Sequence, residues 1–261
     1  MPRRAVAGAW QVASWVQRAV QDPGLAPRWV AGIELLARAD VVHLIGGGYV
    51  TALWPERIGL LAGAAAAVRR SGGRAVVTGQ CFYPAVRGCE PLLRALLERF
   101  DVVDVRDTPS AELAGDGSAV TQSCDDVFLR LGAGAHDLID ATTPAPDYMV
   151  CVQSDAGQVS TPGLAALVLE TLQSWGARPE QVGVVEGIPG MDREVYTLLE
   201  QELPGAQFHP FSELWASGTP IATHQRWISS RFHFHLLAAA AGAPAWRSAS
   251  IRSTTPPNTG P

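Results

Sequence analysis

The chain has 261 residues, of which 47% are hydrophobic and 17% are charged, and its net charge is −5. This length is enough for two ordinary domains, and the composition excludes an intrinsically disordered protein. The negative net charge argues against nucleic-acid binding, because no excess of basic groups would neutralise phosphates. All 20 basic residues are arginine, which excludes a P-loop lysine and a lysine Schiff base. Arginine, histidine and backbone N–H groups are left to bind any anion.

The four cysteines, Cys81, Cys89, Cys124 and Cys151, show no CxxC spacing and indicate free thiols in a reducing compartment. No stretch approaches the ~18 uncharged apolar residues that a membrane span requires. The apolar N-terminal segment is interrupted by Gln11 and lacks a clean cleavage site, which favours a helix over a signal peptide. We therefore expect a cytoplasmic protein without a membrane span.

Strand and helix patterns alternate along the chain. The first part predicts a helix that buries Trp10, Ala13, Val16 and Val20, then strands at 41–45, 75–77, 102–105, 119–121 and 127–129, with helices at 55–70, 91–99 and 110–113 between them. The second part predicts strands at 148–152, 182–185, 207–208 and 227–228, and helices at 161–175, 192–202, 212–216 and 232–241. Such alternation indicates parallel sheets. The predicted fold class is α/β, with two Rossmann-like domains.

A proline-rich stretch at 141–147 has no hydrophobic periodicity and predicts a linker between the domains. The predicted domains are therefore 1–143 and 144–246. Residues 247–261 are rich in Ser, Thr and Pro and predict a flexible tail.

Ligands of open parallel sheets bind outside the carboxyl ends of the strands, and three segments occupy such positions. Gly46, Gly47 and Gly48 follow the strand at 41–45, where glycine lets a backbone approach an anion or make a plain tight turn. The run lacks the spacing of a dinucleotide fingerprint, and the next strand ends in Gln80 rather than in a ribose-binding acid. We therefore do not expect NAD binding.

Two arginines also follow predicted strands. Arg106 follows the strand at 102–105, where it either binds an anion or simply pairs with Asp107. Ser230 and Arg231 precede a helix whose first turn holds His233, a suitable position for anion binding and proton transfer. His233 and His235 point to different sides of that helix and are poor joint metal ligands, so we expect His235 in the core.

Four segments in order resemble the polysaccharide pyruvyl transferase family. They are ADVVHLIGGG at 39–48, VRDTPS at 105–110, DDVF at 125–128, and SRFH at 230–233 followed by the Ala-Gly-Pro exit at 238–244. Taken by themselves, Asp125 and Asp126 are expected to cap a turn or face solvent. The family's strand and loop ahead of the first segment are not matched, which suggests a short or truncated member whose first domain lacks its usual N-terminal strand.

The resemblance implies a GT-B-like arrangement of the two domains and a transferase that moves the enolpyruvyl group of phosphoenolpyruvate to a sugar, forming a pyruvate ketal. It implies that Arg106 and Arg231 bind anions, together with the glycine run and Ser230, and that His233 is catalytic. It implies phosphoenolpyruvate and a sugar or glycan acceptor as partners, with no metal and no cofactor, and leaves a homo-oligomer open. Two alternatives stay open, a non-catalytic binding protein and a GT-B-type glycosyltransferase.

Overall fold

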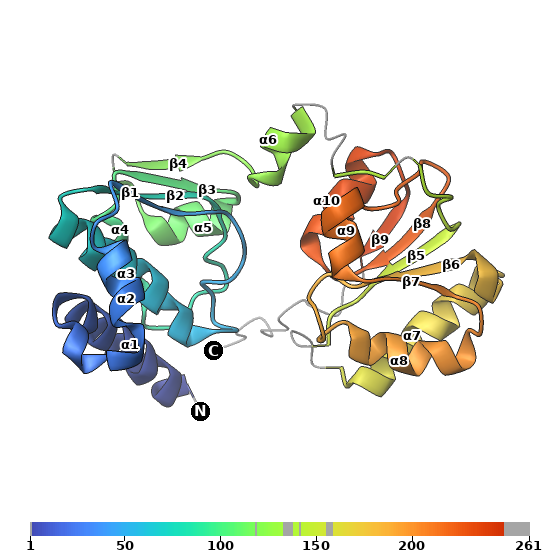
Figure 1. The fold of residues 1–261 in the computed structure, drawn as a ribbon, viewed down its shortest axis with the longest axis horizontal. Helices are drawn as coiled ribbons and strands as arrows, with labels where there is room; N and C mark the ends of the chain where they lie inside the picture. Colours follow the sequence, from blue (N-terminus) through green and yellow to red (C-terminus); the bar gives the residue numbers. More distant parts are fainter. Residues whose placement is uncertain (1, 118, 133–137, 141, 155–158, 248–261) are drawn as a thin grey trace, which may run out of the picture. The chain divides into compact units, whose positions relative to one another are not determined.

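The computed structural model describes residues 2–117, 119–132, 138–140, 142–154 and 159–247 (Figure 1). The chain divides into two compact units, Met1–Leu129 and Arg130–Pro261. Each unit contains one parallel sheet with helices between its strands, so the predicted α/β class is confirmed. Ile139 forms a bridge with Thr219 of the second unit. The linker at 141–147 stays a prediction.

The sheet of the first unit has the strand order β1-β2-β3-β4, all parallel. Its strands are β1 (Val41–Leu44), β2 (Arg74–Gln80), β3 (Val102–Val105) and β4 (Val120–Gln122). The helices are α1 (Pro2–Gln21), α2 (Val30–Leu36), α3 (Ile58–Ser71), α4 (Glu90–Leu97) and α5 (Thr108–Ala114), with short 3₁₀ turns at Pro23–Leu25, Pro27–Trp29 and Pro55–Arg57. Helix α6 (Val127–Gly132) runs across the division between the two units.

The helices that connect these strands, α3, α4 and α5, lie on one face of the first sheet (Figure 1). This follows from the strand order, because right-handed crossovers that all step in one direction put every helix on the same side. Burial along the strands agrees. Val42, Ala75 and Val103 face the helices and are buried, whereas Val41 on the opposite face is 54% exposed.

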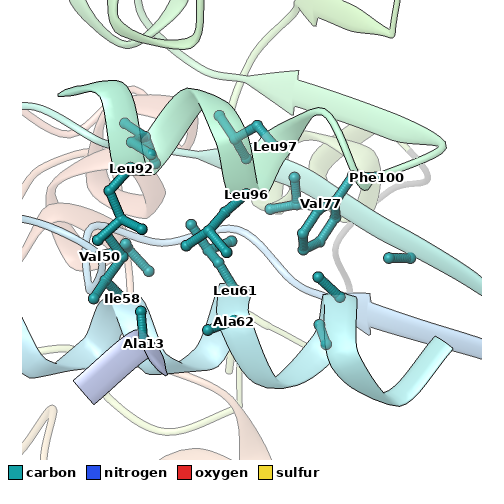
Figure 2. Close-up of a cluster of buried hydrophobic side chains, with 14 of the residues drawn as sticks. Ala13, Val50, Ile58, Leu61, Ala62, Val77, Leu92, Leu96, Leu97 and Phe100 are labelled. Carbon is teal, nitrogen blue, oxygen red and sulfur yellow. The ribbon is translucent and has the colours of Figure 1, made fainter. Parts of the chain in front are cut away.

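The core of the first unit lies between this sheet and its helices (Figure 2). Leu61 of α3 and Leu96 of α4 pack against Val77 of β2, and burying each leucine contributes about 1.5–3 kcal/mol. The N-terminal helix α1 packs on α3, and it buries Ala13 and Val20 as predicted. Trp10 was wrongly expected to be buried, since it is 44% exposed while Ala9 is buried instead.

The sheet of the second unit has the strand order β7-β6-β5-β8-β9. Its strands are β5 (Tyr148–Cys151), β6 (Val182–Val185), β7 (Gln207–His209), β8 (Arg226–Ser229) and β9 (Ala245–Arg247). The helices are α7 (Thr161–Ser174), α8 (Arg193–Glu202), α9 (Phe211–Ser217) and α10 (Phe232–Ala240), with a 3₁₀ turn at Pro179–Gln181. The direction of the crossovers reverses between β5 and β8. Helices α7 and α8 therefore cover one face of this sheet and α9 and α10 the other (Figure 1).

Two segments differ from the sequence prediction. Residues 127–129, predicted as a strand, begin α6, because the Asp125 carboxylate accepts the Val127 N–H at 3.0 Å and turns the chain into a helix. Arg247, assigned to the tail, pairs with Ser229 as the last residue of β9. The rest of the predicted tail, 248–261, lies outside the described residues.

Candidate functional site

The glycine run and Arg106 meet at the carboxyl edge of the first sheet. Gly46, Gly47 and Gly48 follow β1, and Arg106 follows β3. Gly47 forms a bridge with Gln80, whose buried side-chain amide also donates to the Gly47 carbonyl. The Arg106 N–H donates to the Gln80 carbonyl at 3.2 Å, so Gln80 links the two segments. The structure thus brings together all the site residues that were predicted in this unit.

The three glycines make room for neighbouring groups of the protein. Their backbones lack the positive φ that Gly79 has at 54°. A Cβ on Gly46 would lie 2.8 Å from the Gly79 carbonyl oxygen. One on Gly47 would lie 2.8 Å from the Tyr49 ring, and one on Gly48 would lie 3.2 Å from Nη2 of Arg106. Lack of space, rather than turn conformation, explains these glycines.

Arg106 is held by a buried carboxylate. Its Nη1 lies 2.5 Å from Oδ2 of Asp125, and the two side chains are 12% and 3% exposed. Asp107, the partner considered from the sequence, accepts the Ser110 N–H at 2.8 Å and caps α5. The expectation that Asp125 would only cap a turn or face solvent was wrong, because Asp125 pairs with Arg106 as well as accepting the Val127 N–H.

Asp126 ties the glycine run to the neighbouring strand. Its Oδ2 accepts the Gly46 N–H at 2.8 Å and the Thr78 hydroxyl at 2.7 Å. The Thr78 hydroxyl lies 2.8 Å from Nε2 of His43 on β1. Sequence reasoning missed this chain of contacts. The available signal was a pair of carboxylates directly after β4, at the same edge of the sheet as the glycines.

The second group of predicted residues lies where the strand order of the second sheet reverses. Parallel sheets bind ligands at such a reversal, outside the carboxyl ends of the strands. Ser230 follows β8, and its hydroxyl accepts the Gln153 N–H at 2.8 Å while its own N–H donates to the Cys151 carbonyl at 3.0 Å. Ser230 therefore joins the loops after β5 and β8. The Ser230 hydroxyl, which the sequence suggested as a substrate-binding group, thus makes a structural hydrogen bond.

Arg231 forms a forked ion pair with Asp192, which lies between β6 and α8. Nε of Arg231 donates to Oδ2 at 3.1 Å and Nη2 donates to Oδ1 at 2.5 Å. Arg231 is 13% exposed and Asp192 is 2% exposed. Asp192 was recognised from the sequence only as the start of a helix. Each predicted arginine is thus fixed by a buried aspartate from another segment of its own unit.

The two histidines of α10 differ in exposure, as their spacing predicts. His233 in the first turn is exposed and His235 is partly buried. The His233 ring packs edge-on against Phe232, with 5.7 Å between ring centroids. An exposed imidazole two residues after Arg231 can exchange a proton with a bound molecule.

The thiols near these groups are unsuited to nucleophilic chemistry. Burial raises the pKa of Cys151 far above its usual value, and the negative charge of Asp192 adds to the shift while Arg231 opposes it. Burial also raises the pKa of Cys81, with a further contribution from Asp107. Both thiols therefore stay protonated at neutral pH. Within the described ranges, no group of three or more His, Cys, Asp or Glu side chains could hold a metal ion.

The comparisons with known proteins give one match. The family model of polysaccharide pyruvyl transferase matches residues 13–247, which span both sheets. Neither the curated proteins nor the solved structures gave a match. In the part of the chain that the structure describes, no helix has the length and apolar character needed to cross a membrane. Because the match covers most of the chain, including the glycine run and both arginine segments, this protein belongs to the polysaccharide pyruvyl transferase family.

Proposed function

We propose that this protein transfers the enolpyruvyl group of phosphoenolpyruvate to two hydroxyls of a sugar, forming a cyclic pyruvate ketal. The methylene carbon of phosphoenolpyruvate gains a proton, and the two hydroxyl oxygens bond to C2. The bond from C2 to the phosphate oxygen breaks, and inorganic phosphate leaves. The two hydroxyl protons balance the reaction, one ending on the new methyl group and one on phosphate.

The observation that carries this proposal is the fixed arginine at the carboxyl end of β8. Phosphoenolpyruvate has a carboxylate and a phosphate, and a planar guanidinium recognises both kinds of group through paired N–H donors. A guanidinium has five N–H donors, so one that is held by a carboxylate can still donate to another anion. We propose that Arg231 binds the donor substrate in this way, with Ser230 holding the loop that carries it.

We further propose that His233 is the catalytic acid or base. It lies two residues after Arg231, in the first turn of α10, and is exposed. An imidazole can accept a proton from a hydroxyl and pass one on. Such a proton transfer contributes about 10²- to 10⁴-fold to a reaction rate.

The remaining parts of the proposal concern the whole chain. We propose a GT-B-like arrangement of Rossmann-like domains, in which Arg106 and the glycine run contribute to the same site as Arg231. The buried pairing of Arg106 with Asp125 supports a role for this arginine in directed hydrogen bonding. The reducing environment indicated by four free cysteines supports a cytoplasmic location.

A ligand-dependent thermal shift tests the proposal against its alternatives. A ligand that binds only the folded protein raises the melting temperature, by an amount that grows with the ratio of its concentration to its dissociation constant. Phosphoenolpyruvate should raise it, and a nucleotide sugar should not. A rise with nucleotide sugar alone would favour a glycosyltransferase, and no rise with either would favour a non-catalytic protein.

A further inference from the structure

Asp192 is the centre of a buried polar cluster in the second unit. Its Oδ2 accepts the N–H groups of Gly187 and Ile188, both at 2.9 Å, as well as Nε of Arg231. Its Oδ1 accepts Nη2 of Arg231 at 2.5 Å. The carboxylate is therefore fixed by the backbone of the loop after β6, and it in turn fixes the plane of the guanidinium.

Asp192 does not serve the helix that it precedes. It occupies the N-cap position of α8, but its side chain makes no capping hydrogen bond there. An aspartate placed for helix stability would accept an N–H of the first turn of α8. The carboxylate turns instead toward Arg231, which follows a different strand. This orientation points to a role in holding the arginine.

We propose that Asp192 is a positioning residue, which holds the Arg231 guanidinium in the orientation that binds the anionic donor substrate. The inference rests on the proposed function of Arg231. A guanidinium held at both Nε and Nη2 cannot turn about its Nε–Cζ bond without breaking a hydrogen bond. The guanidinium plane therefore keeps a constant direction, and binding an anion restricts this side chain less than it would restrict a mobile one.

The loop beside this pair is packed too closely to admit a larger residue. A Cβ on Gly187 would lie 2.9 Å from Cε2 of Phe234 and 3.1 Å from Oδ2 of Asp192. It would also lie 3.5 Å from Cγ of Arg231. Gly187→Ala should therefore displace the ion pair while leaving both charges in place.

Glu186 provides a matched control in the same loop. It is as buried as Asp192, at 2% exposed. Its carboxylate accepts the Gly190 N–H at 2.9 Å and the Phe211 N–H at 3.1 Å, and it pairs with Arg193 at 3.2 Å. Glu186→Gln therefore removes a buried charge from this loop and leaves Asp192, which holds Arg231, unchanged.

The experiment compares Asp192→Asn, Arg231→Lys, the double variant and Glu186→Gln. The side-chain oxygen of asparagine can still accept hydrogen bonds from the loop N–H groups, but its amide nitrogen cannot accept one from Nη2 of Arg231. Asp192→Asn should weaken phosphoenolpyruvate binding in calorimetry by about 10- to 100-fold. The double variant should bind no more weakly than Arg231→Lys, because Asp192 acts through Arg231. Glu186→Gln should keep wild-type affinity even where its melting temperature falls.

Three results would overturn the proposal. They are wild-type affinity in Asp192→Asn, losses that add fully in the double variant, and an equal loss in Glu186→Gln. If Asp192→Asn does not fold, Gly187→Ala replaces it and should show the same weakened binding.

A second measurement separates this inference from the proposed function. NMR can follow rotation about the Nε–Cζ bond of Arg231, with the signal assigned by its loss in Arg231→Lys. The rotation should be faster in Asp192→Asn than in the wild type or in Glu186→Gln. If the wild type does not bind phosphoenolpyruvate, the proposed function fails, and this rate still decides whether Asp192 holds Arg231. An unchanged rate would contradict the positioning role.

Discussion

Gly48 lies against the guanidinium of Arg106, and a Cβ at this glycine would be 3.2 Å from Nη2. The contact joins the segments that follow β1 and β3, the two strands that flank β2 in the sheet. The other side of the same guanidinium is held by Asp125 at 2.5 Å. Arg106 is thus confined between a glycine and a buried carboxylate.

This confinement makes Gly48→Ala a test of the role of Arg106. The added methyl group should move the guanidinium by a few tenths of an ångström and weaken phosphoenolpyruvate binding several-fold, as measured by calorimetry. Gly32→Ala is the control, because a Cβ on Gly32 has no heavy atom within 4 Å. It should leave affinity unchanged and stabilise α2 by about 0.5–1 kcal/mol. Equal affinities in both variants would remove Arg106 from the binding site.

Substitutions of His233 and His235 should have different effects, one on the rate of catalysis and the other on stability. His233→Gln should lower the rate of ketal formation by about 10²- to 10⁴-fold and leave phosphoenolpyruvate binding intact. His235 is partly buried, so His235→Gln should chiefly lower the melting temperature. Assays of ketal formation and of thermal unfolding on both variants check this assignment. Full turnover by His233→Gln, or the reverse distribution of losses, would refute it.

His209 should make the stability of the second unit depend on pH. Burial lowers the pKa of His209, while the negative charges of Glu213 and Asp140 oppose the shift. The side chain is 9% exposed, and its Nε2 has no hydrogen-bond partner among the described residues. Protonation therefore favours the unfolded chain. The stabilisation is complete above the unfolded pKa of about 6.5 and is lost as the pH falls through the lower pKa of the folded state.

Urea unfolding at several pH values between about 7.5 and about 5 tests this expectation, because that range spans the pKa of histidine in the unfolded chain. His209→Gln should flatten the decline in unfolding free energy toward low pH. A slope that His209→Gln does not change would show that other groups cause the pH dependence.

Limited proteolysis should cut the chain within 141–147 and leave two protected fragments. This segment is rich in proline and has no hydrophobic periodicity, and it lies in the sequence between the segments that form the two sheets. We therefore expect it to be more open to proteases than the sheets are. Mass spectrometry of the fragments identifies the site. A single core that resists cleavage throughout this segment would count against two separable domains.

The strands of the central sheets could be predicted closely because they are continuous apolar runs between clear turn signals. The predicted strands 102–105 and 182–185 agree with β3 and β6 residue by residue. Segments with few apolar residues were less predictable. Residues 127–129 form a helix because Asp125 accepts a local N–H, and β9 forms only because β8 offers its edge.

In the candidate site, too, some residues could be predicted from the sequence and others could not. Arg106 and Arg231 could be located from the sequence, because each lies within two residues of the end of a predicted strand. Their partners Asp125 and Asp192 could not, since each pairing depends on which strands are neighbours in the sheet and on how a loop turns its carboxylate. For the same reason the role of Gly48 became clear only when Arg106 was found beside it.

The central claim, that phosphoenolpyruvate binds at Arg231, is tested most directly by calorimetric titration of phosphoenolpyruvate into three proteins. They are the wild type, Arg231→Lys and Arg226→Lys, the last a control at an exposed arginine that begins β8. The wild type and Arg226→Lys should bind with the same affinity, and Arg231→Lys should bind about 10- to 100-fold more weakly, because lysine keeps the charge but loses the fork. No saturable binding by the wild type, or equal affinity in all three proteins, would contradict the claim.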